Sequence, residues 1–116
     1  MILTLMRSKL HSATVTQADL NYQGSISIDE NLLEASGILP FEQVDVVNIN
    51  NGERFTTYVI KAKKGSKEIK INGAAARKAQ VGDKVIIIAY AQFSEEEAKR
   101  FEPRIIILNP NNDPKP

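Results

Sequence analysis

The dipeptide Gly24-Ser25, in the run from Tyr22 to Ile28, carries the most specific chemistry in this sequence. A serine hydroxyl can attack the carbonyl of a preceding glycine in an N→O acyl shift, because glycine leaves that carbonyl unobstructed and tolerates strained backbone angles. Elimination from the resulting ester, followed by hydrolysis, leaves a ketone at residue 25. Most Gly-Ser pairs are turns, however, and this pair alone indicates only a turn before a strand.

Arg54, Lys9 and His11 are candidates for holding an anionic ligand. Arg54 follows the tight turn Asn51-Gly52, so its guanidinium has a firmly placed base and the fork geometry that a carboxylate needs. A solvated strand arginine is the commoner alternative. Lys9 and His11 share one face if their stretch is extended. His11 is open to a second interpretation, as an ordinary polar residue at the rim of a barrel.

Two further segments offer polar groups to a ligand. Strand periodicity places Arg54, Thr56 and Tyr58 on one face and Thr57 on the other, so Thr57 and Tyr58 reach active sites only through a twist or by serving different subunits. Tyr58 is a candidate proton donor, and the alternative is a core aromatic. The small residues from Asn72 to Ala76 let a ligand approach backbone N–H groups, although close barrel packing needs small residues too.

These segments together resemble one enzyme family. Lys9-Leu10-His11, Gly24-Ser25, the run from Asn51 to Tyr58 and the run from Asn72 to Arg77 resemble the pyruvoyl-dependent aspartate 1-decarboxylases, over about residues 1–103. The resemblance implies decarboxylation of L-aspartate to β-alanine for pantothenate biosynthesis. It also implies a mainly β fold, a six-stranded double-psi β-barrel with a few short helices, assembled as a cytoplasmic homotetramer with its site at a subunit interface.

The resemblance also implies a role for each matching residue. The single domain 1–116 is expected to cleave itself into a β chain, 1–24, and an α chain, 25–116, converting Ser25 into a covalent pyruvoyl group that forms a Schiff base with the substrate. Neither a metal nor pyridoxal phosphate is then needed. Tyr58 would be the proton donor, and Gly24, Ser25, Thr57 and Tyr22 would take part in self-processing. The implied substrate-binding residues are Lys9, His11, Arg54, Thr57, Asn72, Gly73, Ala74 and Ala75.

Three residues depart from the family pattern: Val47 and Arg77 stand where tryptophan and histidine are common, and Lys78 stands where some members carry cysteine. None touches the expected chemistry, but pocket shape and processing rate can differ. The sequence leaves open whether cleavage is spontaneous or needs a maturation factor. It also leaves open which substrate carboxylate Lys9 and Arg54 each bind.

Turn signals about every ten residues indicate short strands, in a barrel or a sandwich. Strands are expected at 2–6, 25–28, 44–49, 54–62, 67–71, 84–90 and 105–108, the sixth buried on both faces. Asp29 and Gly37 bracket a predicted helix, residues 74–79 suit one or two helical turns, and Ser94 with Glu97 forms a capping box. Residues 109–116 are polar and proline-rich, so a frayed tail is expected.

Composition limits the other classes of function. The chain has 116 residues, a net charge of +1, no cysteine and one histidine, so disulfides, thiolate metal sites and multi-histidine metal sites within one chain are excluded. No basic stripe marks a nucleic-acid surface. The start of the chain, from Met1 to Met6, reads as a strand rather than a signal peptide, and the longest apolar run, Val85 to Ala91, is too short for a membrane span.

Two other classes remain as alternatives to the enzyme. The first is a non-catalytic β-barrel that binds a small acidic ligand or a protein, with Gly24-Ser25 as a plain turn. The second, a nucleic-acid-binding barrel, is disfavoured by the balanced charge. A chain this small also leaves little interior for an enclosed site, which favours a site completed by a neighbouring subunit.

Overall fold

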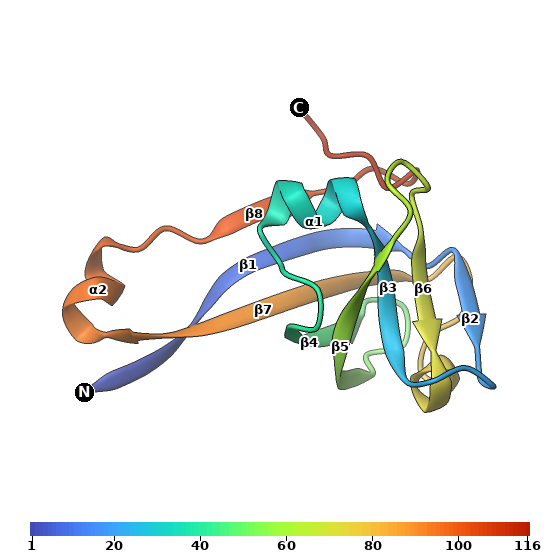
Figure 1. The fold of residues 1–116 in the computed structure, drawn as a ribbon, viewed down its shortest axis with the longest axis horizontal. Helices are drawn as coiled ribbons and strands as arrows, with labels where there is room; N and C mark the ends of the chain where they lie inside the picture. Colours follow the sequence, from blue (N-terminus) through green and yellow to red (C-terminus); the bar gives the residue numbers. More distant parts are fainter.

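The computed structural model describes residues 1–116 and is mainly β with few short helices, as expected (Figure 1). The strands are β1 (Ile2–Thr14), β2 (Gln17–Asp19), β3 (Ser25–Asp29), β4 (Gln43–Asn48), β5 (Arg54–Ala62), β6 (Ile69–Asn72), β7 (Lys84–Ser94) and β8 (Arg104–Ile107). The helices are α1 (Glu30–Ser36), the 3₁₀ helix η1 (Gly73–Arg77) and α2 (Glu95–Arg100). None of these three helices has the length and hydropathy that a membrane span requires.

The strands form one strongly curved sheet in the order β2-β6-β3-β5-β4-β7-β1-β8. Its end strands are not paired with each other, but the chain passes directly from β1 into β2 through Val15 and Thr16. The Val15 N–H donates to Asp83 O at 2.9 Å, and the Thr16 N–H donates to Ile69 O at 2.9 Å. These bonds draw the two halves of the sheet around one core of isoleucine, valine and leucine side chains, which gives a barrel-like body.

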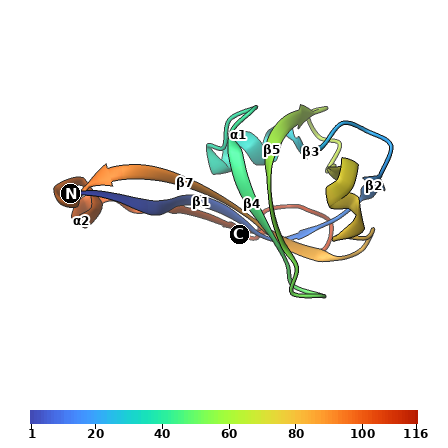
Figure 2. The same cartoon turned by 90° about the horizontal axis from the view of Figure 1, so that it is seen from below.

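A two-stranded arm extends from this body (Figures 1 and 2). It consists of the first half of β1 and the second half of β7, which pair in register from Ile2 opposite Ser94 to Met6 opposite Tyr90. The predicted capping box of Ser94 and Glu97 starts α2 at its tip. Both strands are longer than the ranges 2–6 and 84–90 expected from the sequence.

The burial of β7 differs from the expectation of a strand buried on both faces. Val85, Ile87 and Ala89 are buried, whereas Ile86 and Ile88 between them are only partly covered. One face of β7 therefore packs against the core, and the other face is only partly covered by the rest of the chain.

Helix α1 is bracketed as the sequence predicts. The Asp29 carboxylate accepts from the Asn31 N–H, and Gly37 ends the helix with a left-handed φ of 76°. Asp29 also accepts from the N–H groups of Gly65 and Lys67, at 2.9 and 2.8 Å. Since Asp29 is the last residue of β3, its carboxylate ties that end of the strand to both α1 and the loop before β6.

The C-terminal segment is bonded to the body rather than free of it, which the prediction of a frayed tail at 109–116 did not anticipate. Asn112 is 3% exposed, and its side chain bonds the Thr14 N–H, the Thr14 carbonyl and the Lys67 carbonyl. The segment has almost no apolar side chain to bury, so its composition alone could not indicate that a buried asparagine amide holds it.

Candidate active site

Gly24-Ser25 lies where β3 begins, between β5 and β6. Ser25 pairs with Asn72 of β6, and β3 pairs in parallel with β5 only from Ile26 opposite Val59 onward. Continuing that register backward puts Ser25 beside Tyr58 and Gly24 beside Thr57. The dipeptide therefore stands at the point where the edge of β5 becomes free.

The Ser25 hydroxyl is buried in a small polar cluster. It donates to the Gln23 carbonyl at 3.3 Å and accepts from the Asn72 side-chain amide at 3.0 Å. The same amide group donates to Ser27 at 3.1 Å. Asn72 is fully buried, yet its side-chain oxygen has no partner within the chain. Leaving a buried hydrogen-bond acceptor without a donor costs stability, and such unpaired groups are often found at functional sites.

Gly73 lies against the backbone of Gly24. It has a φ of +77°, and a Cβ placed there would lie 2.7 Å from the Gly24 Cα and 2.9 Å from the Gly24 N. Only glycine permits both this backbone conformation and this approach. Gly73 thus allows the two backbone segments to pack directly against each other beside the dipeptide.

An open pocket of about 430 Å³ lies beside the dipeptide. Its lining residues are Gly24, Phe55, Thr56, Thr57, Tyr58, Asn72, Ala74, Ala75 and Lys78. Thr57 and Tyr58 both reach it, although they point to opposite faces of β5. They do so because the pocket lies along the unpaired edge of the strand, where successive side chains flank the same space.

Six of the residues predicted for the site line this pocket, and two more adjoin it. Gly24, Thr57, Tyr58, Asn72, Ala74 and Ala75 line it. Ser25 is bonded to Asn72, and Gly73 touches Gly24. The prediction missed Lys78, Phe55 and Thr56 as lining residues. Lys78 is the residue that ends η1, so its place at the pocket depends on how that short helix is positioned.

The remaining predicted residues lie elsewhere in the chain. Lys9 and His11 are on β1, which β4 and β7 separate from β5 in the sheet. His11 Nδ1 is buried without a partner. Tyr22 lies exposed in the loop before β3, where its ring is 4.5 Å from the Lys70 ammonium. These residues do not line the pocket of their own chain.

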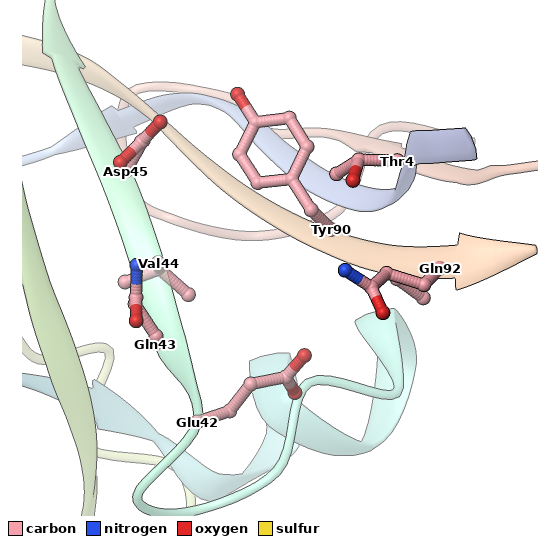
Figure 3. A pocket seen from close by; sticks show the side chains of 8 residues that line it. Thr4, Glu42, Gln43, Val44, Asp45, Tyr90 and Gln92 are labelled. Atoms are coloured by element: carbon pink, nitrogen blue, oxygen red, sulfur yellow. The ribbon is translucent and has the colours of Figure 1, made fainter. Parts of the chain in front are cut away.

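Arg54 does not line that pocket either, but its charge acts on Tyr90, which lines a second hollow (Figure 3). There Asp45 of β4 and Tyr90 of β7 flank an open space of about 300 Å³. Burial and the neighbouring Asp45 raise the pKa of Tyr90, and the charge of Arg54 opposes that rise. The Thr56 hydroxyl donates to the Asp45 carboxylate at 2.7 Å, so Thr56, which lines the pocket beside Gly24, also bonds a residue of this second hollow.

The fold and the site define a small, mainly β protein with a Gly-Ser peptide bond at the edge of an open polar pocket. A family model described as aspartate decarboxylase matches residues 1–115. The chain is 62% identical over 112 residues to an aspartate 1-decarboxylase of Maricaulis maris, covering 97% of this chain and 93% of that one. It is 59% identical over 115 residues to one of Phenylobacterium zucineum, covering 99% and 98%. The chain belongs to the aspartate decarboxylase family.

Proposed function

We propose that this protein cleaves its own backbone between Gly24 and Ser25 and then decarboxylates L-aspartate to β-alanine and CO₂, supplying pantothenate biosynthesis. The observation that carries the proposal is the placement of this peptide bond beside a pocket lined by Thr57, Tyr58 and Asn72. The names of the similar proteins, aspartate 1-decarboxylase, support the choice of substrate.

The surroundings of Ser25 suit self-cleavage. Its hydroxyl attacks the Gly24 carbonyl, the C–N bond breaks, and an ester joins the two residues. Loss of the Ser25 α-proton then expels the Gly24 carboxylate and leaves dehydroalanine, which water converts to a pyruvoyl group with release of ammonia. Thr57 would donate to the oxyanion that forms in the first step, and its position in the lining of the pocket beside Gly24 supports this role. The bond from Asn72 to the Ser25 oxygen orients the nucleophile.

The residues around the resulting pyruvoyl group fit it and the substrate. The group supplies a ketone that withdraws electrons from the breaking C–CO₂ bond. Asn72 has an unpaired oxygen for an N–H donor of the substrate, and Ala74 and Ala75 leave room for a ligand near the backbone. Tyr58, which also lines the pocket, would return a proton to the carbon that loses CO₂.

We further propose that the active assembly is a homotetramer in which Lys9 and His11 of one protomer complete the pocket of another. Support comes from their separation from β5 within the chain and from the unpaired nitrogen of His11. A binding residue with a buried, unsatisfied group is expected to find its partner in the assembly or the ligand. Arg54, which does not line the pocket of its own chain, joins the site in the same assembly.

Intact-mass measurement of the purified protein tests the proposal. Wild-type protein is expected to give two fragments that divide after residue 24, the larger lacking a free amine. Ser25→Ala should remain folded, uncleaved and inactive toward L-aspartate. The matched control is Ser27→Ala, since Ser27 bonds the same Asn72 amide but lies outside the cleaved dipeptide, and this variant should still cleave. An intact wild-type chain would contradict the proposal and favour a non-catalytic binding protein.

A further inference from the structure

The pocket beside Gly24 contains one cationic side chain of its own chain, Lys78. Neither Lys9 nor Arg54 lines it. For a dicarboxylate in this space, Lys78 is therefore the one positively charged residue among those that line the pocket. The other lining side chains are small, aromatic, hydroxyl-bearing or amide-bearing, and none of these neutralises a carboxylate.

Three hydrogen bonds hold the backbone of Lys78 in place. Its carbonyl accepts from the side-chain amides of Asn48 and Asn51, each at 3.0 Å. Its N–H donates to the Ala75 carbonyl at 2.9 Å and so ends η1. Asn48 is fully buried and also bonds Asp83 at 2.8 Å, so it is itself fixed. The Cα of Lys78 is thus fixed at the rim of the pocket, and its long side chain can change rotamer from there.

The resting partner of this ammonium is weak. Lys78 Nζ lies 3.8 Å from the Glu53 carboxylate, and the two side chains are 47% and 51% exposed. An exposed ion pair at that distance contributes between zero and about 1 kcal/mol. A substrate carboxylate can therefore displace Glu53 at little cost.

We propose that Lys78 is a substrate-specificity residue that binds one carboxylate of the dicarboxylate substrate at the mouth of this pocket. The inference rests on the proposed function, because it assigns the substrate of the same site. Lysine acts here as a mobile point charge that exchanges Glu53 for the ligand. Glu53 in turn keeps the ammonium near the mouth when no ligand is bound.

The test compares Lys78→Met and Lys78→Arg in fully cleaved enzyme. Lys78→Met should raise the KM for aspartate about tenfold or more and change kcat little, because a charged hydrogen bond to the ligand is lost. Lys78→Arg should have a KM close to that of the wild type, because it keeps the positive charge. A merely structural role of Lys78 would not explain this result. The control is Lys63→Met, an exposed lysine in the loop after β5, which should leave KM unchanged. Glu53→Gln should lower KM.

A second measurement separates this inference from the proposed function. Succinate, a dicarboxylate without an amine, is titrated into uncleaved Ser25→Ala protein with and without Lys78→Met. Weaker succinate binding in the double variant supports the role of Lys78 even if no cleavage occurs in the wild type. Succinate binding that is equal with and without Lys78→Met would overturn the role of Lys78. A Lys78→Met enzyme that cleaves more slowly but has an unchanged KM for aspartate would overturn it as well.

Discussion

Gly73 packs against Gly24, next to the scissile bond, so closely that it leaves no room for a side chain. Gly73→Ala adds a methyl group 2.7 Å from the Gly24 Cα and forces an L side chain into a φ of +77°. The conformational strain costs about 1–2 kcal/mol, and the overlap about 1–3 kcal/mol more unless Gly24 moves. We expect this variant to fold with reduced stability and to cleave much more slowly than the wild type, measured by intact mass over time.

Gly82→Ala is the matched control for strain without overlap. Gly82 has a φ of +92°, but a Cβ there meets nothing within 4 Å. It should lose a similar amount of stability from the backbone strain and retain normal cleavage. If both variants cleave equally, the contact between Gly73 and Gly24 does not control self-processing.

Strand β3 connects the site to the rest of the fold, because Ser25 begins it and Asp29 ends it. Burial opposes ionisation of Asp29, but N–H donors from Asn31, Gly65 and Lys67, with the charge of Lys67, outweigh it and lower its pKa below the ordinary 3.8. A depressed carboxyl pKa contributes stability that is fully present above about pH 4 and is lost as the pH falls through the folded-state pKa.

Asp29→Asn removes this contribution while keeping a side chain that can cap α1. The amide nitrogen cannot accept from the Lys67 N–H, which now bonds the carboxylate at 2.8 Å. We expect a loss of about 1–3 kcal/mol at pH 7, shrinking below about pH 4, by urea denaturation across pH. The control is Asp19→Asn, because the Asp19 carboxylate accepts only from the exposed Asn21 N–H. An equal loss in both variants at every pH would contradict this account.

Elements defined by neighbouring residues were predictable, whereas those defined by distant pairing were not. Asp29 and Gly37 bracket α1 as expected, and β5 spans the expected residues 54–62 after the Asn51-Gly52 turn. Local capping and turn chemistry suffices for both. The full lengths of β1 and β7 depend on their pairing with each other across most of the chain, which no local pattern encodes.

The candidate site shows the same division between local and long-range information. Residue types and the family resemblance indicated the Gly24-Ser25 bond, Thr57, Tyr58 and Asn72, and the fold brings these together. Periodicity alone could not place Thr57 and Tyr58 at one pocket, because that depends on where β3 stops pairing with β5. Lys78 was missed because its position depends on the turn of η1 and on bonds from Asn48 and Asn51.

At the scale of the whole molecule, the separation of Lys9 from Tyr58 predicts that each active site draws on two chains. Lys9 lies on β1 and Tyr58 on β5, with β7 and β4 between them. Tyr58→Phe should cleave normally and lose about 10²- to 10⁴-fold in turnover, the usual contribution of a positioned proton donor. Lys9→Ala should be poorly active at low aspartate concentration.

Co-expression of these two variants tests whether sites are shared. If Lys9 of one protomer serves Tyr58 of another, random mixing leaves both residues intact in about one site in four, so about a quarter of wild-type activity returns. The control mixture pairs the wild-type chain with the Lys9→Ala/Tyr58→Phe double variant. Shared sites give about a quarter in this mixture too, whereas sites within one chain give about half here and none in the first mixture. Equal recovery in the two mixtures is thus the expected result, and activity confined to the control mixture would show that a single chain forms the whole site.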